Sequence, residues 1–176
     1  MTMNRPVRLI AMDVDGVLTG GEVIHGSGGM EIKHFHVQDG MGITIAAHAG
    51  LVPVVITARE SEAVTRRTRE LKIEEVHQGV HRKWSRLEKV LEKHGVEPEE
   101  TAYIGDDLVD LPAMRKVGLP IAVANAVEEV KREAAFVTTR NGGNGAVREA
   151  VEYILKRDGK WEEVVAAIIE HLSGDE

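Results

Sequence analysis

Short runs of apolar, mostly β-branched residues alternate along this chain with stretches of helical spacing, and this alternation constrains the fold more than any other feature. Several runs are apolar without a polar residue at every second position, which is typical of strands that helices cover on both faces. Strand–helix–strand repetition predicts right-handed crossovers and an α/β fold with a doubly wound, mostly parallel sheet. The predicted strands span residues 8–14, 51–58, 74–78, 101–105, 120–124 and 135–138, and the predicted helices span 42–49, 61–71, 83–94, 111–117 and 127–133.

Two segments depart from this rhythm. Residues 22–37 predict two short strands around a glycine-rich turn, a β-hairpin that either pairs with another subunit through its exposed edge or lies on its own domain. Residues 160–172 predict an amphipathic helix that docks either on its own domain or on a neighbouring subunit. Its apolar stripe consists of Trp161, Val164, Val165, Ile168, Ile169 and Leu172. Since no linker interrupts the pattern, we expect one domain over residues 1–176.

The composition excludes several classes of function. The chain has no cysteine, which rules out disulfides and thiolate metal sites. A net charge of −7 argues against nucleic acid as a partner, and the two Trp, two Tyr and two Phe are too few for base-stacking platforms. No apolar run approaches the ~18 residues of a membrane span, and Met1–Pro6 is too polar for a signal peptide. We therefore expect a cytoplasmic protein that binds neither nucleic acid nor membrane.

Acidic residues gather where the predicted strands end. The carboxyl ends of parallel strands share one edge of the sheet, where ligands bind. The residues expected there are Asp13, Asp15, Thr57, Arg59, Lys83, Asp106, Asp107 and Asp110. Two unit charges about 4 Å apart repel by about 4 kcal/mol at an effective dielectric of about 20, so such a cluster needs a compensating charge. Magnesium suits carboxylate ligands and leaves places for a phosphate, whereas the simpler interpretation is that these aspartates form turns and helix caps.

The ordered motifs DxDGVLT at residues 13–19, Thr57, Lys83 and GDDxxD at residues 105–110 resemble those of haloacid dehalogenase-like phosphatases. The runs HVQDGMG at residues 36–42, GDDLVDLPAM at 105–114 and GGNGAVRE at 142–149 resemble the 3-deoxy-D-manno-octulosonate 8-phosphate (KDO 8-phosphate) phosphatase family. This resemblance covers nearly the whole chain. It implies a Rossmann-like core, a magnesium-dependent phosphatase for a sugar-acid phosphate, and a role in lipopolysaccharide biosynthesis.

The residue types indicate how such an enzyme would work. Asp13 is expected to attack phosphorus and form an aspartyl-phosphate. Asp15 is expected to protonate the leaving sugar oxygen and then to deprotonate the hydrolytic water. Thr57 would donate hydrogen bonds to the phosphoryl oxygens, and Lys83 would neutralise charge on the nucleophile and on the transferring group.

The expected metal ligands are Asp13, Asp106 and Asp15, the last through its backbone carbonyl as the resemblance implies. Asp107 is expected to hold a metal-bound water or Lys83. Asp110 is expected to cap or support the loop.

The spacing of the motifs leaves no room for a cap domain. One helix and one strand fill the interval between Thr57 and Lys83, and the hairpin and one helix fill that between Asp13 and Thr57. The chain thus resembles the capless subgroup, whose site is open to water in a monomer. The resembling family forms homotetramers in which the hairpin assembles the oligomer and helps to shape a neighbour's site, and the hairpin here is consistent with that assembly.

The substrate itself is less closely defined. Arg59 and Arg67 match substrate-binding arginines of the family, although Arg59 could instead form a surface ion pair and Arg67 could lie on the solvated face of a charged helix. Gln38 and Thr44 stand where many relatives carry a base, which weakens the attraction for one particular keto-sugar acid. The alternatives are another 2-keto-3-deoxy or nonulosonic acid phosphate, or a bulky phosphorylated substrate at an open site. A third alternative is a phosphoacceptor domain without catalytic activity. Asp15 argues against it, because an acid/base residue beside the nucleophile serves to hydrolyse the aspartyl-phosphate.

Overall fold

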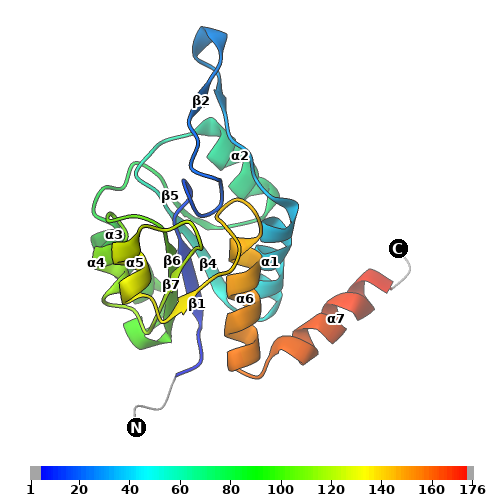
Figure 1. Cartoon of the computed structure of the whole chain (residues 1–176). Coiled ribbons are helices and arrows are strands. Elements are labelled where there is room, and N and C mark those ends of the chain that lie inside the picture. Colours follow the sequence, from blue (N-terminus) through cyan, green and yellow to red (C-terminus); the bar gives the residue numbers. More distant parts are fainter. Residues whose placement is uncertain (1–4, 174–176) are drawn as a thin grey trace.

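The computed structural model describes residues 5–173 and contains a six-stranded parallel sheet between layers of helices (Figure 1). The strands lie in the order β5-β4-β1-β6-β7-β8, and every neighbouring pair is parallel. Their bounds are β1 Leu9–Met12, β4 Val52–Ile56, β5 Glu75–His77, β6 Thr101–Gly105, β7 Leu119–Ala122 and β8 Phe136–Val137. Each lies in or overlaps a predicted run, so the α/β fold class and the doubly wound, mostly parallel sheet are confirmed.

The helices form two groups. α1 contacts α6 and α7 on one side of the sheet, whereas α4 contacts α3 and α5 on the other (Figure 1). Because both faces are covered, every residue of β1 and of β6 is buried, which explains the missing polar alternation. The helices are α1 Val37–His48, α2 Glu62–Glu70, α3 Lys83–His94, α4 Leu111–Met114, α5 Glu128–Glu133, α6 Ala146–Arg157 and α7 Trp161–Ser173, with a 3-10 turn at Pro98–Glu100.

Helix α1 begins at Val37, several residues before the predicted start at residue 42. Gly40 and Gly42 interrupt the apolar spacing of its first turns, which hid the true start. Gly42 has a packing reason, because a Cβ there would lie 2.8 Å from the Cα of Arg148 in α6. Asp39 in the first turn accepts hydrogen bonds from the backbone N–H groups of Gly145 and Arg148, which joins α1 to the start of α6.

The predicted hairpin is present and projects away from the sheet (Figure 1). It pairs β2 Ile24–His25 with β3 Glu31–Ile32 in antiparallel fashion, around a 3-10 turn at Ser27–Gly29. Both strands are only two residues long, so most of residues 22–37 is irregular. Four apolar side chains of the hairpin are exposed: Val23, Ile24, Met30 and Ile32.

The carboxyl-terminal helix α7 docks by its first turns. Trp161, Val164 and Ile168 pack against the core, whereas Ile169 and Leu172 remain exposed toward the far end. No helix in residues 5–173 has the length and apolar character needed to cross a bilayer. Residues 1–4 and 174–176 lie outside the described part of the chain, and most of the Met1–Pro6 segment is among them. The single-domain organisation of residues 1–176 stays a prediction.

Candidate active site

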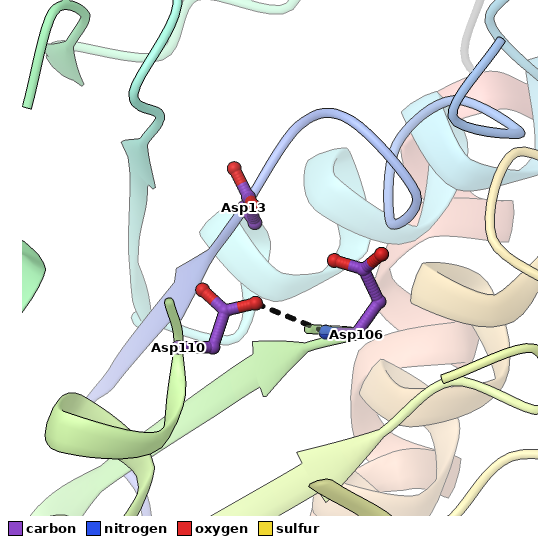
Figure 2. A group of neighbouring side chains, drawn as sticks. All are labelled: Asp13, Asp106 and Asp110. Atoms are coloured by element: carbon purple, nitrogen blue, oxygen red, sulfur yellow. Dashed lines mark hydrogen bonds between the residues drawn. The ribbon is translucent and has the colours of Figure 1, made fainter. Parts of the chain in front are cut away.

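The site lies at the carboxyl ends of β1 and β6, two adjacent strands. From β1 the chain continues to α1 on one side of the sheet, and from β6 it continues to α4 on the other, so this is a topological switch point where α/β proteins bind ligands. Asp13 follows β1, and Asp106 and Asp110 follow β6. Each offers a carboxylate oxygen within 4.8 Å of the others, and Figure 2 shows the three side chains gathered from the segment after β1 and the segment after β6.

Gly16, the glycine of the DxDG motif, allows the two loops to meet. Its φ is +87°, in the left-handed region, and a Cβ there would lie 2.0 Å from Oδ2 of Asp106. The glycine-rich loop before α6 packs against the same turn, since a Cβ on Gly142 would lie 1.7 Å from the carbonyl oxygen of Gly16. The Gly143 N–H also donates to the carbonyl of Val17. The motif around residues 142–149 therefore supports the loop that carries Asp13.

Lys83 is the first residue of α3 and is 1% exposed. Its Nζ lies 2.6 Å from Oδ2 of Asp13 and 2.7 Å from Oδ1 of Asp110. Burial alone would lower the pKa of Lys83, but the two adjacent carboxylates more than offset it, so the pKa lies above its ordinary value and the ammonium stays charged. Asp107, expected to hold a metal-bound water or Lys83, does not hold Lys83: Asp110 takes that place, and Oδ1 of Asp107 accepts from the N–H of Leu108.

Asp110 connects the parts of the site. It is fully buried, and its carboxylate accepts hydrogen bonds from the hydroxyl of Tyr103 at 2.8 Å and from the backbone N–H of Asp106 at 3.0 Å. The side chain can turn back toward β6 because Gly105 has no Cβ, which would otherwise lie 2.6 Å from the Cβ of Asp110. The expected support of the loop is thus observed, together with an ion pair to Lys83 that the motif spacing did not indicate.

The electrostatics of the site call for a further cation. Burial raises the pKa of Asp13 to about 6, with repulsion from Asp110 as the second cause. Burial also raises the pKa of Asp106, to about 7, and repulsion from Asp110 and Asp13 adds to it. Oδ1 of Asp106 is buried and accepts no hydrogen bond from the described residues. The ammonium of Lys83 thus pairs with two of the three carboxylates, those of Asp13 and Asp110, whereas Oδ1 of Asp106 has no partner among the described residues. This donor set fits a hard divalent cation such as magnesium.

Thr57 and Asp15 complete the edge of the site. Thr57 follows β4, is buried, and is fixed by its backbone: its N–H donates to the carbonyl of His77, and its carbonyl accepts from the N–H of Val80. Asp15 lies two residues after Asp13 and keeps 22% of its side chain exposed. The nucleophile candidate is therefore buried, whereas the acid/base candidate lies at the solvent boundary.

The two candidate substrate arginines lie beside the hairpin. The guanidinium of Arg59 lies 3.0 Å from Glu31 and 3.9 Å from Oδ2 of Asp15, and 44% of this side chain is exposed. Arg67 forms an ion pair with Glu70 at 3.2 Å on α2. Both arginines line an open groove of about 850 Å³ between the hairpin and α2. The structure thus brings Arg59 to Asp15 and places Arg67 in the same groove.

The two positions that depart from the family pattern make local contacts. Gln38 accepts a hydrogen bond from the guanidinium of Arg140 at 2.6 Å, so a base from the loop after β8 lies beside this residue. Thr44 donates to the carbonyl of Gly40 within α1. The replacement at residue 38 therefore does not leave this part of the chain without a cation.

Some residues of the site were not recognised from the sequence. Lys33, which follows β3, contacts Asp15, and Glu31 in β3 contacts Arg59. Tyr103 reaches Asp110 from within β6. A signal existed for Tyr103, because a tyrosine in a fully buried strand needs a hydrogen-bond partner for its hydroxyl.

Carboxylates on neighbouring strand ends, joined by a buried lysine over a doubly wound sheet, supply the charges that phosphoryl transfer requires. The sequence profile of the haloacid dehalogenase-like hydrolase family matches residues 55–150, and relatives that are 42% identical align over most of the chain. The chain therefore belongs to this family. It is an enzyme of phosphatase type, which excludes the non-catalytic phosphoacceptor alternative.

Within the family, the chain is similar to KDO 8-phosphate phosphatases. It is 42% identical over 163 residues to the enzyme of Salmonella typhi, which covers 93% of this chain and 87% of that protein. The enzyme of Moraxella catarrhalis, solved in complex with a magnesium ion, a phosphate ion and KDO, superposes with a TM-score of 0.89 at 42% identity, covering 92% of this chain and 93% of that one. The cobalt-bound enzyme of Haemophilus influenzae has a TM-score of 0.85 at 39% identity and covers 88% and 91% of the two chains.

Proposed function

We propose that this enzyme is a magnesium-dependent phosphatase that hydrolyses KDO 8-phosphate through an aspartyl-phosphate on Asp13. The observation that carries the proposal is the convergence of Asp13 and Asp106, with a buried oxygen that has no hydrogen-bond partner, at the switch point of the sheet. The similarity to an enzyme solved with magnesium, phosphate and KDO supports the metal and the substrate.

In the first step a carboxylate oxygen of Asp13 forms a bond to phosphorus, and the bond from phosphorus to the sugar oxygen breaks. Asp15 supplies the proton that the leaving oxygen takes. Lys83, held 2.6 Å from Asp13, orients the attacking carboxylate and balances the charge on the phosphoryl group. Thr57 donates hydrogen bonds to the phosphoryl oxygens.

In the second step Asp15, now ionised, takes a proton from water. The water oxygen forms a bond to phosphorus, and the bond to Asp13 breaks, so that inorganic phosphate leaves and both aspartates return to their starting state. The partial exposure of Asp15 suits this role because the residue must meet both the leaving group and water.

Asp13, Asp106 and the backbone carbonyl of Asp15 would hold the magnesium ion, with Asp107 nearby as support. When bound, magnesium supplies the positive charge that the acidic cluster lacks and that the phosphoryl group requires. Asp110 would stay with Lys83 and Tyr103, because its hydrogen bonds to these residues already satisfy its carboxylate.

We infer that the sugar acid lies in the groove between the hairpin and α2. Arg59 is half exposed beside Asp15 and can turn toward a carboxylate, and Arg67 lines the same groove. Gln38 leaves another 2-keto-3-deoxy or nonulosonic acid phosphate as the alternative substrate, because it replaces a base of the family pattern.

We further propose a cytoplasmic homotetramer that serves lipopolysaccharide biosynthesis. The exposed apolar residues Val23, Ile24, Met30 and Ile32 on the hairpin favour contact between subunits. Size measurement in solution tests the assembly. A stable monomer would favour the alternative of a bulky substrate at an open site.

A phosphate-release screen over KDO 8-phosphate, other keto-sugar acid phosphates and simple sugar phosphates tests the proposed function. With magnesium, the highest kcat/KM is expected for KDO 8-phosphate, and Asp13→Asn is expected to abolish release. The control Glu128→Gln removes a surface carboxylate of α5, so it should retain full activity. Undiminished turnover by Asp13→Asn would refute the nucleophile, and a higher kcat/KM for a sugar phosphate without a carboxylate would refute the substrate class.

A further inference from the structure

Lys33 is the unusual residue of the hairpin. Apolar side chains around it are exposed, yet the side chain of Lys33 is only 1% exposed. Its Nζ donates to Oδ1 of Asp15 and lies 3.7 Å from Oε1 of Glu31. A lysine on a projecting hairpin would ordinarily extend into water, so its burial against two carboxylates marks a specific contact.

The energetics of burial make this contact strongly oriented. Removing an ammonium from water costs several kcal/mol unless carboxylates or other acceptors replace the lost hydration. Asp15 and Glu31 together supply that replacement for Lys33. The same contact fixes one oxygen of Asp15, because Oδ1 accepts from Lys33 while Oδ2 faces the guanidinium of Arg59.

The hairpin is in turn anchored to the body of the molecule. Glu31 accepts hydrogen bonds from the guanidinium of Arg59 at 3.0 Å and from the hydroxyl of Ser61, both in the segment between β4 and α2. The cations beside Asp15 differ in exposure: Lys33 is enclosed, whereas 44% of Arg59 is exposed. Arg59 is thus free to exchange Glu31 for an anion of the substrate, and Lys33 is not.

From these contacts we infer that Lys33 is a positioning residue that holds the carboxylate of Asp15 in the orientation needed for proton transfer. The inference rests on the proposed function, in which Asp15 is the acid and base. It gives the hairpin a role in the site of its own chain, apart from any role in contacts between subunits. It also assigns different roles to two neighbouring cations: Lys33 acts in catalysis through Asp15, whereas Arg59 binds the substrate.

The kinetic test compares Lys33→Met, Lys33→Arg and the control Lys131→Met. The control removes a lysine that forms a surface ion pair with Glu128 on α5 and, within residues 5–173, forms no ion pair with Asp15. A positioned general acid/base contributes about 10²–10⁴ in rate, so we expect Lys33→Met to lower kcat by about 10- to 100-fold with KM changed by less than about threefold. Lys33→Arg is expected to recover part of the lost kcat, and Lys131→Met to match the wild type.

A second measurement needs no turnover. The melting temperatures of Lys33→Met, Asp15→Asn and the double variant form a cycle that reports the contact itself. We expect the double variant to melt higher than the sum of the single shifts predicts, because each single change removes the same contact and leaves Lys33 with Glu31 alone or Asp15 with Arg59 alone. Additive shifts would overturn the inference.

The kinetic outcomes separate the inference from the proposed function. An active wild type with Lys33→Met within about twofold of its kcat, or with the loss confined to KM, would overturn the positioning role alone. A wild type that releases phosphate from no sugar phosphate would instead refute the proposed function, and the inference would fall with it even if the melting cycle shows a coupled pair.

Discussion

The acidic cluster predicts that removing one of its charges stabilises the metal-free enzyme. Asp106 carries a buried oxygen without a hydrogen-bond partner, and its pKa is raised from an ordinary 3.8 to about 7 by burial and by repulsion from Asp110 and Asp13. In Asp106→Asn the side chain keeps its size and loses its charge. The variant should therefore be more stable than the wild type wherever Asp106 would be ionised.

The magnitude follows from the pKa. A group whose folded pKa is raised from 3.8 to about 7 destabilises the folded state by about 4 kcal/mol once fully ionised, at about 1.36 kcal/mol per pKa unit. Partial exposure of Asp106 screens the charge, so we expect about 2–3 kcal/mol. The gain should be absent below about pH 4, grow as the pH rises through 4 to 7, and be complete above about pH 8. For a chain of this size it corresponds to roughly 5–10 °C in melting temperature.

Magnesium should reverse the order of stability of the wild type and Asp106→Asn. In a chelator at pH 8, Asp106→Asn should melt above the wild type. With magnesium at about 100 times its dissociation constant, the wild type gains about 2.7 kcal/mol and the variant, which lacks a ligand, gains much less. Thermal unfolding in chelator and in magnesium between pH 5 and pH 8 measures both effects. A variant that is less stable than the wild type in chelator at pH 8, or that gains as much from magnesium, would refute the reasoning.

Three further changes test other contacts. Glu75→Gln in β5 should lower the free energy of unfolding by about 1–3 kcal/mol at pH 7, because burial would raise the pKa of this carboxyl but hydrogen bonds from Lys93 and His94 lower it to about 2. The stability that the ionised Glu75 contributes is present above about pH 4.5 and is lost as the pH falls toward 2. In urea unfolding, the difference in stability between wild type and variant should therefore be smaller at pH 3 than at pH 7. Lys83→Met should cost about 3–5 kcal/mol in chelator, measured by urea unfolding, and should abolish phosphate release, since it leaves buried carboxylates without their cation. Gly16→Ala should cost more than about 1 kcal/mol and should weaken stabilisation by magnesium in a thermal melt, because its φ is positive and its Cβ would meet the carboxylate of residue 106.

The outcomes against these predictions are equally specific. A pH-independent effect of Glu75→Gln would show that its hydrogen bonds do not depend on ionisation. A stable and active Lys83→Met would remove the lysine from the site. Retention of full magnesium stabilisation by Gly16→Ala would mean that residue 106 does not have to approach this turn.

The sequence was sufficient for the sheet and for the main acidic residues. Runs that are apolar throughout are typical of strands covered on both faces, and their alternation with helical spacing predicted a parallel sheet. The strand order itself was not predicted, because the chain passes from β5 at one edge of the sheet to β6 on the far side of β1. Asp13 and Asp106 then meet because β1 and β6 are neighbours, although the two residues are far apart along the chain. This part of the site was predictable because the carboxyl ends of parallel strands share one edge of the sheet.

The contacts of Lys33 and Asp110 depend on local backbone geometry instead. The hairpin strands are two residues long, and such short strands do not reveal which side chains turn inward, so Lys33 had the pattern of an exposed residue. Asp110 reaches Lys83 because the backbone at Gly105 leaves room for it, which no spacing rule expresses. The roles of Thr57, Arg59 and Arg67 stay predictions, since they concern a substrate.

The central claim is that Asp13 becomes covalently phosphorylated during turnover. Acid quenching of the enzyme during turnover of KDO 8-phosphate with magnesium, followed by borohydride reduction, would convert an aspartyl-phosphate into homoserine, which peptide mass spectrometry locates. The account predicts homoserine at residue 13 and nowhere else. Homoserine at residue 15 or 106, or an unmodified residue 13 after rapid quenching within the first turnover of active enzyme, would contradict it.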